Sequence, residues 1–461
     1  MTQPDPRDAQ IADLMKRLDV ALKRIAELEA RLGMNSKNSS EPPSSDFPDT
    51  KSKGNPTGRK RGGQPGHEPS KRELLPVEQV DQIADHWPVV CAGCKTMLPR
   101  ELRAEIGEAA RHQVTEFPRL QAEVTEHRLH SQLCECRGHA TEAALPAAVP
   151  TGAFGPRLRG IIAVCAGQYR LSKRTTQQLL SDLLGVKLGL GSICNVERQV
   201  SEALAAPVEE VREFVRRQPA VHADETGWRE NKGRAWLWTA STPLATVFQI
   251  AKSRGAAVAR QILGDNFSGF LVVDRWNAYE WTDLRQLCWA HLLRDFQGFV
   301  DRCGRGAELG KKLLAQSRKM FELWHPVRDK TLDRASFLSD MQPIERRICR
   351  LLRDALACQE PKTAGMAREI YKRRQSLWSF VDNDGVQPTN NAAERAIRPA
   401  VLWRKGSFGT DSSPGTRFVE RILSVATTLK QQQRHLLDYL TAACAAHDVG
   451  LEPHSLLPQT A

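Results

Sequence analysis

Apolar residues near the start of the chain recur with the seven-residue period of helices that pair with one another. The a and d positions of this heptad pattern are held by Ile11, Leu14, Leu18, Ala21, Ile25, Leu28 and Leu32. Three heptads can pair helices but are marginal for a helix alone. We therefore predict a coiled coil over residues 1–33 that joins copies of the chain through residues 11–32, as a homodimer or higher oligomer. Docking of an amphipathic helix on its own chain is the alternative.

Residues 34–75 contain almost no large apolar side chain and are rich in Ser, Pro, Gly and Lys. A segment of this composition cannot bury a core, so we predict a disordered basic linker. Within it, Arg59, Lys60 and Arg61 precede two glycines and resemble the basic arms that lie in a DNA minor groove. A solvated run of charge is the alternative.

Residues 76–150 carry two closely spaced cysteine pairs. These cysteines are Cys91, Cys94, Cys134 and Cys136. Two thiolate pairs are what a tetrahedral structural zinc ion requires, and the alternating residues 111–133 predict a β-hairpin that would fold one pair onto the other. We therefore predict a zinc-binding, DNA-binding module with one structural Zn²⁺. Four unrelated free cysteines are the alternative, and a histidine could replace one thiolate, the candidates being His127, His130 and His139.

Helical spacing of apolar residues marks the region 155–207. One stripe ends at Gly185 and consists of Leu179, Leu180, Leu183 and Leu184. Ser192 is expected to cap a second helix, whose apolar face is Ile193, Val196 and Val200. Two short helices joined by a glycine-rich turn allow a helix-turn-helix that binds DNA. A plain helical connector fits the same pattern.

A β-rich run follows, with strands predicted over 219–228, 234–242, 245–253 and 269–274 and a helix over 255–263. In the first strand, the period of two places His222, Asp224 and Thr226 on one face. The last strand is apolar until it ends in Asp274. A carboxylate at the tip of a buried strand is costly unless it is paired or holds a cation.

A further candidate segment is residues 388–410, where Asn390 or Asn391 can cap a helix and Pro399 limits its unkinked length. On this helix Glu394 shares a face with the two asparagines and with Arg398, which suits a site for a metal ion and a phosphate. The stretch from Asn391 to Glu394 also fits a capping box, in which Glu394 only closes back onto the cap.

Three amphipathic helices are predicted over 305–380, and a helical tail over 431–461. They form a helical insertion between Asp274 and Glu394, which leaves both acids free to meet at one sheet. Cys288 and His291 stand where a strand edge runs into a helix. They could support the site or fill core space, and core packing is the favoured interpretation.

The composition favours a polyanionic partner, because the 461 residues carry a formal net charge of +12. No apolar run approaches the roughly 18 residues of a membrane span, and we expect neither a secretory signal nor a membrane partner. The 11 cysteines are an odd number and mostly stand singly in helical patterns. We therefore expect a reducing, cytoplasmic environment rather than a disulfide framework.

Several segments, in this order along nearly the whole chain, resemble the DDE transposases of bacterial insertion sequences, in the insertion-sequence sixty-six family. The matching segments are Lys37-Asn-Ser-Ser-Glu-Pro-Pro-Ser44, Gly62-Gly-Gln-Pro-Gly-His67, the cysteine pairs, His222-Ala-Asp-Glu-Thr226 and Thr389-Asn-Asn-Ala-Ala-Glu-Arg395, followed by Arg404-Lys405. The family pattern has small residues after the second aspartate, whereas Arg275 and Trp276 stand there in this chain.

The resemblance implies that Asp224, Asp274 and Glu394 are the acidic triad of a ribonuclease-H-like catalytic domain, residues 208–430. The expected fold class is multidomain α+β, with the coiled coil, zinc module and helical region before that domain. Two Mg²⁺ or Mn²⁺ ions held by the three acids would allow phosphodiester hydrolysis at the transposon ends and joining to target DNA.

The same resemblance implies double-stranded DNA as the partner, association with the bacterial nucleoid and a possible need for accessory proteins. Four cations after Glu394 are placed to meet the DNA backbone, with surface solvation as the alternative: Arg395, Arg398, Arg404 and Lys405. An inactive DNA-binding relative of a transposase is the alternative function, and a general nuclease is a weaker one.

Overall fold

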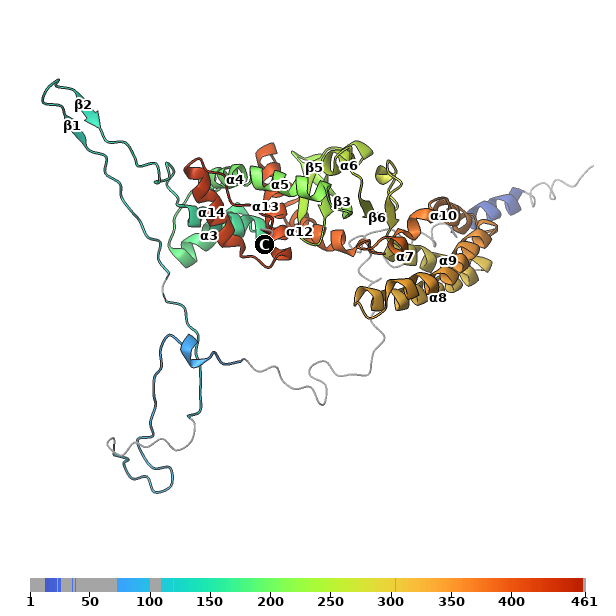
Figure 1. Ribbon diagram of the computed structural model, residues 1–461, viewed down its shortest axis with the longest axis horizontal. Coiled ribbons are helices and arrows are strands. Elements are labelled where there is room, and N and C mark those ends of the chain that lie inside the picture. The colour runs from blue at the N-terminus through green and yellow to red at the C-terminus, as the bar shows by residue number, and fades with distance from the viewer. Residues whose placement is uncertain are drawn as a thin grey trace, which may run out of the picture. The chain divides into compact units, whose positions relative to one another are not determined.

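The computed structural model describes residues 13–22, 24–25, 35, 38, 73–99, 109–118, 120–302 and 304–458 (Figure 1). The chain divides into two compact units. The larger combines residues 1–50 with 123–461, and the smaller is residues 51–122.

A five-stranded mixed sheet is the centre of the larger unit. Its strands are β3 (Ala220–Glu230), β4 (Gly233–Ser241), β5 (Thr246–Ala251), β6 (Phe270–Val273) and β7 (Arg285–Leu287). Their order is β5-β4-β3-β6-β7, with β4 antiparallel to both β3 and β5, and β6 parallel to both β3 and β7. The four strands predicted from alternation and apolar runs are confirmed, each within a few residues of its expected ends.

Helices cover both faces of this sheet (Figure 1). On one face lie α12 (Asn391–Ser407) and α13 (Ser413–Gln431), which pack on β3, β4 and β5. On the other face lie α5 (Ala205–Arg216) and α6 (Ala256–Leu263). Trp228 belongs to the apolar cluster with α12 and α13, whereas Val221 and Ala223 belong to the main core on the opposite side. The period-two alternation of β3 therefore holds in the structure.

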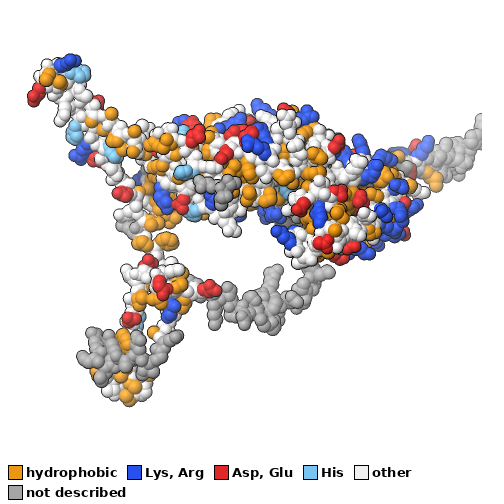
Figure 2. Space-filling model, viewed as in Figure 1, with side chains coloured by type: hydrophobic (Ala, Val, Ile, Leu, Met, Phe, Trp, Pro, Cys, Tyr) orange, Lys and Arg blue, Asp and Glu red, His pale blue; other side chains and the backbone are white. Residues whose placement is uncertain are grey.

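The predicted helical insertion is also present. After α7 (Trp289–Val300) come α8 (Arg305–Arg328), α9 (Arg334–Leu356), α10 (Pro361–Lys372), the short turn η6 (Arg374–Leu377) and α11 (Ser379–Asp382). The face of α8 expected from its spacing is buried, with Leu313, Ser317 and Met320 each fully enclosed. Lysine and arginine side chains crowd the outer surface of this insertion in Figure 2.

A helical group precedes the sheet in sequence. It consists of α2 (Pro156–Ala163), a π-helical turn η4 (Val164–Gln168), α3 (Lys173–Leu184) and α4 (Leu190–Ala203). α14 (Leu436–Asp448) packs on α2 and α4, so the helical part of the predicted tail belongs to this group. Gly185 ends α3 in the left-handed conformation as expected, but Ser192 does not cap α4, which begins at Leu190 after Gly189.

The hairpin predicted over residues 111–133 is wrong. The described part of 111–130 forms no strand, and the pairing lies later, between β1 (Ser131–Leu133) and β2 (Ala140–Glu142). The alternating apolar side chains find no surface to pack on, since Val114, Phe117 and Val124 are 79%, 78% and 88% exposed. Alternation without burial does not stabilise a strand.

The described part of the heptad segment, residues 13–22 and 24–25, is helical. Its heptad side chains Leu14, Leu18 and Ile25 are 61%, 60% and 51% exposed. In the smaller unit the described structure contains one short 3₁₀ turn, η2 (Val77–Gln79). Most of the predicted linker, including Arg59, Lys60 and Arg61, lies outside the described residues. Among the described helices, none is long and apolar enough to cross a membrane.

Candidate active site between the sheet and helix α12

Asp224 lies on β3 with its side chain directed toward α12. The residues two before and two after it on the same face both contact that helix: the Nδ1 atom of His222 is 3.3 Å from Oδ1 of Asn390, and Arg404 Nη1 donates to Oγ1 of Thr226 at 3.2 Å. Side chains two apart on a strand share a face, so Asp224 is presented to the same helix.

Asp274 follows the end of β6 and neighbours Asp224 across the sheet. β3 and β6 are parallel, with His222 opposite Val272, and each aspartate stands two residues further along its own strand direction. One carboxylate oxygen of Asp274 accepts the backbone N–H of Trp276 at 2.8 Å. This bond fixes the aspartate at the strand tip although large residues follow it.

Glu394 is brought to the sheet by Asn390, the N-cap residue of α12. Asn390 donates its side-chain amide to the carbonyl of Ala223 at 2.8 Å, and its backbone N–H donates to Sγ of Cys288 at 3.1 Å. Glu394 follows one helical turn later, and its backbone N–H bonds the Asn390 carbonyl. The start of α12 is thereby attached to the residue adjacent to Asp224.

The capping-box alternative for Glu394 is excluded. The helix N-cap is Asn390, so Glu394 stands one position too far along to close the box, and the Asn390 N–H is already bonded to Cys288. Within the described structure, Oε1 of Glu394 is buried and has no hydrogen-bond partner. A buried carboxylate oxygen without a donor is costly unless it meets a cation.

The raised pKa values of Asp224 and Asp274 also favour a bound cation at this site. Burial raises the pKa of Asp224 well above its usual range, and the nearby carboxylates of Glu225, Asp274 and Glu394 raise it further. Burial also raises the pKa of Asp274, against the opposing effect of the Trp276 N–H and nearby arginines. Like charges gathered in a half-buried place disfavour the ionised state. Oxygen ligands of this kind fit a hard divalent cation, whose charge would remove the penalty.

Glu225 points to the opposite face of β3 and has a structural role. Its carboxylate accepts the hydroxyl of Tyr279 at 2.6 Å and pairs with Arg254 at 2.7 Å. The Glu225 carboxylate is thus satisfied by these two partners.

Cys288 and His291 come to the site, whereas core packing was the favoured interpretation from the sequence. Donor atoms of Cys288, His291 and Glu394 all lie within 4.8 Å of one another, a geometry that could hold a metal ion. The Nδ1 atom of His291 is 3.8 Å from Oε1 of Glu394, and Arg294 lies 3.9 Å from the same oxygen. Burial lowers the pKa of His291 to about 3 and raises that of Cys288 to about 11. The Cys-x-x-His spacing at a helix start was the available signal.

The predicted DNA-contacting cations of α12 lie on its outer part. Arg395, Arg398 and Lys405 are exposed, and among the described residues none of them forms an ion pair. Arg404 is half-buried and donates to Thr226 and to the carbonyl of Gly227. The exposed side chains of Arg395, Arg398 and Lys405 are therefore available to contact phosphates.

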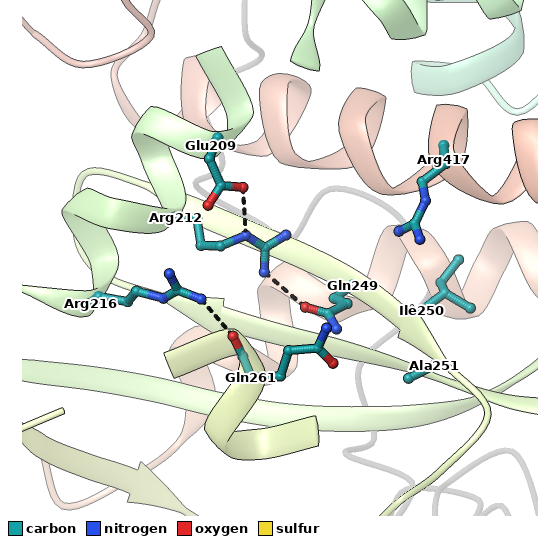
Figure 3. A pocket seen from close by; sticks show the side chains of 8 residues that line it. All are labelled: Glu209, Arg212, Arg216, Gln249, Ile250, Ala251, Gln261 and Arg417. Carbon is teal, nitrogen blue, oxygen red and sulfur yellow. Dashed lines mark hydrogen bonds and ion pairs between the residues drawn. The ribbon is translucent and has the colours of Figure 1, made fainter. Parts of the chain in front are cut away.

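A separate arginine-lined hollow of about 380 Å³ lies at the edge of the sheet (Figure 3). Its arginines are already partnered: Arg212 bonds Glu209 and Gln249, and Arg216 bonds the carbonyl of Gln261 and pairs with Glu213. The third, Arg417, pairs with Glu420. We interpret this hollow as a structural network joining α5, β5 and α13.

Each cysteine pair stands in a tight turn. In the smaller unit, Cys91 donates its N–H to the carbonyl of Thr96, and hydrogen bonds from Thr96 lower the pKa of Cys94 to about 7. In the larger unit, the Cys134 N–H donates to the carbonyl of His139, and Cys136 is in the same turn. All four thiols are free. The zinc site formed by these four cysteines stays a prediction.

Residues 151–417 match the family described as Transposase IS66 family. The matched range includes the sheet, the helical insertion and all three acids. Residues 2–73 match a family of unknown function, DUF6444. A protein of Sinorhizobium fredii, described as uncharacterized protein y4qI, is 26% identical over 427 residues, which covers 83% of this chain and 75% of the relative.

Proposed function

Because the chain belongs to the IS66 transposase family, we propose that it is an active DDE transposase. It would bind the terminal inverted repeats of an insertion sequence, hydrolyse the DNA at those ends and join the freed 3′-hydroxyls to target DNA. The observation that carries this proposal is the meeting of Asp224, Asp274 and Glu394 from three separate elements around one half-buried place.

The order and direction of the strands support a ribonuclease-H-like fold for this domain. Three antiparallel strands come first, and two parallel strands are added on the other side of β3. Asp224 then lies on the central strand and Asp274 at the end of the adjacent one. Glu394 comes from a later helix across the sheet face, so the long helical insertion does not disturb the site.

In the proposed mechanism Asp224, Asp274 and Glu394 would together hold two divalent cations. Bound there, the ions would supply an activated nucleophile and would offset the charge on the leaving oxygen. The chain's own residues position these ligands: Trp276 orients Asp274, and Asn390 holds the start of α12 against β3.

Two successive displacements at phosphorus account for the reaction. Water attacks the phosphodiester at the transposon end, the P–O bond to the 3′ oxygen breaks, and a proton returns to that oxygen to give a 3′-hydroxyl. This hydroxyl then attacks a phosphodiester of target DNA and displaces its 3′ oxygen. Each bond formed replaces one broken, so no covalent protein intermediate is required.

The test is incubation of the full chain with a duplex carrying its own terminal repeat and Mg²⁺. We expect nicking at the repeat boundary that a chelator abolishes and that Asp224→Asn reduces below detection. Asp265→Asn removes an exposed acid away from the site and should leave the rate unchanged. Equal cleavage by the wild type and Asp224→Asn would contradict the proposed catalytic role.

The alternative function is a DNA-binding protein with an inactive catalytic domain. It predicts specific binding of the same duplex and no cleavage with either Mg²⁺ or Mn²⁺. A general nuclease would cut the repeat duplex and an unrelated duplex equally.

A further inference from the structure

We propose that the end of the β3–β4 hairpin and the C-terminal end of α12 together form a second DNA-contact site. It would bind backbone phosphates with unpaired cations and stack a base on Phe408, about five base pairs from the phosphate at the acids. We call this surface the hairpin site and define it by Arg229, Lys232, Arg234, Arg404 and Phe408. The inference rests on the proposed function for the identity of its ligand.

The two elements of the hairpin site are fixed to each other. The hairpin turns at Asn231 and Lys232, which have positive φ angles of 48° and 61°. The Asn231 N–H donates to the carbonyl of Thr410 at 2.8 Å, and the Thr410 N–H donates to the carbonyl of Arg229 at 2.9 Å. These bonds join the turn to the segment that follows α12, so the surface is preorganised.

The approach of these backbones requires a glycine. Gly409 has φ of 122°, and a Cβ atom there would stand 2.2 Å from the carbonyl oxygen of Arg229. Only glycine tolerates both this conformation and this contact. Gly409 therefore allows the segment that follows α12 to pack directly against the hairpin.

The charge of the hairpin site lacks internal compensation. The hollow beside the hairpin measures about 420 Å³ and is lined by Arg229, Lys232, Arg234 and Arg404 among others. Within the described structure, none of these four cations forms an ion pair, in contrast to the arginines of the hollow in Figure 3. Glu230 is the acid on the same turn, and it too forms no ion pair there. Four cations beside a single acid leave a net positive charge, which is the electrostatic pattern of a site for a polyanion.

An exposed aromatic ring stands beside these cations. Phe408 is 75% exposed, adopts a left-handed φ of 62°, and its N–H bonds the carbonyl of Arg404 at 2.8 Å. A large apolar ring held outward at a disfavoured backbone angle suggests a functional constraint. Nearby Trp236 is already covered by Arg234 and Arg254, whose guanidinium carbons lie 5.1 and 4.7 Å from its ring centre. Phe408 is therefore the ring available for stacking on a base.

The distance from the acids to the hairpin site is similar along both elements, although the odd spacing from Asp224 directs the Arg229 side chain to the other face of β3. From Asp224 to Arg229 are five strand positions, or about 16 Å at a rise of about 3.3 Å each. From Glu394 to Arg404 are ten helical positions, or about 15 Å at a rise of about 1.5 Å. The two values agree. Duplex DNA rises about 3.4 Å per base pair, so a duplex with one phosphate at the acids reaches the hairpin site about five base pairs away.

Binding of a labelled duplex of arbitrary sequence tests the phosphate contacts, in the absence of divalent metal. Arg229→Ala/Lys232→Ala/Arg234→Ala should lose three contacts, which lowers the salt slope of the logarithm of affinity by about 2.7 and weakens binding about tenfold or more. The control, Lys311→Ala/Lys312→Ala/Arg318→Ala, removes the same charge from the exposed face of α8. An unchanged slope in the hairpin variant, or an equal fall in both variants, would overturn the proposal.

Base stacking is tested with 2-aminopurine placed in turn at each position from a duplex end with a 3′-hydroxyl. We expect a fluorescence change that peaks about five base pairs from that end, persists in Phe408→Tyr and disappears in Phe408→Ala. An identical profile in Phe408→Ala would contradict the assignment, provided that its circular dichroism matches the wild type. Neither experiment requires cleavage. If binding and stacking depend on the hairpin site but the chain never cuts DNA, the catalytic proposal fails and this one stands.

Discussion

Asp224 illustrates how a single residue can be unfavourable for the fold and necessary for the proposed chemistry. Its carboxylate is held among those of Glu225, Asp274 and Glu394 without a cation of its own. Sites of this kind lower the stability of the metal-free protein in exchange for ligand affinity. The stability of variants at this position is therefore informative.

Asp224→Asn should raise the unfolding temperature of the metal-free protein by a few degrees near neutral pH. Because the folded-state pKa of Asp224 is raised, the folded state binds more protons than the unfolded state above the usual aspartate pKa, and stability falls as pH rises through that window. The gain from the amide should therefore shrink at acidic pH. Calorimetry with chelator present measures both effects, and a variant less stable than wild type near neutral pH would contradict the account.

Asn390 positions Glu394 without touching substrate. Asn390→Ala removes its bonds to the Ala223 carbonyl and to His222, which leaves a buried acceptor unpaired and should cost about 1–3 kcal/mol of unfolding free energy. We expect DNA cleavage to fall as well, since the start of α12 loses its attachment to β3. The matched control is Asn391→Ala, at the adjacent exposed residue. Denaturant unfolding with equal losses in both variants would remove this positioning role from Asn390.

For single residues, the sequence predicted which side chains could belong to the site but not which of their possible roles each one has. Glu394 fitted a capping box and a metal site equally, because both depend on the same local spacing. The position of the N-cap at Asn390, whose N–H bonds Cys288, separates them. For Cys288 and His291 the sequence indicated core packing, and Cys288 is indeed buried. Cys288 and His291 lie close to Glu394 although more than a hundred positions separate them in the sequence. A local sequence pattern cannot predict a contact over that separation.

Among the elements, strands and amphipathic helices were the most predictable, because each buries a periodic face. β3 to β6 and the three long insertion helices follow this rule. The prediction failed where periodicity was not matched by burial, as in residues 111–133, and where a glycine rather than Ser192 precedes α4. α12 continues through Pro399 to Ser407, so the proline did not end that helix.

The junction of α12 with the β3–β4 hairpin gives a paired prediction. Gly409→Ala places a methyl group against the Arg229 carbonyl at a backbone angle that alanine disfavours, and should cost at least about 1–3 kcal/mol. Gly406→Ala, within α12 and with open space around it, should be neutral or stabilising by about 0.5–1 kcal/mol. Chemical denaturation of the two variants distinguishes them. Similar stabilities would show that the close approach is not needed.

At the scale of the whole molecule, the exposed heptad side chains offer a surface through which copies of the chain can assemble. Leu14, Leu18 and Ile25 present apolar side chains from residues 13–25 to the surroundings of a single chain. This exposure is consistent with the predicted pairing of copies through residues 11–32.

Leu18→Lys/Ile25→Lys places charges at two a positions of the heptad. If a coiled coil joins the copies, sedimentation velocity should show the wild-type oligomer replaced by a monomer, because buried lysines oppose one another at the seam. Lys16→Ala, at an exposed polar position of the same helix, serves as the control and should keep the wild-type distribution. An unchanged oligomer in the double variant would place assembly elsewhere.

The central claim is that three distant carboxylates hold two cations at one place. Electron paramagnetic resonance of the chain titrated with Mn²⁺ in the presence of cleavage-resistant duplex tests it most directly, since ions about 3.5–4 Å apart give the spectrum of a coupled pair. The account predicts this coupled spectrum in the wild type and its loss in Asp224→Asn, Asp274→Asn and Glu394→Gln. A wild-type spectrum of isolated ions only, or a coupled spectrum that survives in Glu394→Gln, would contradict it.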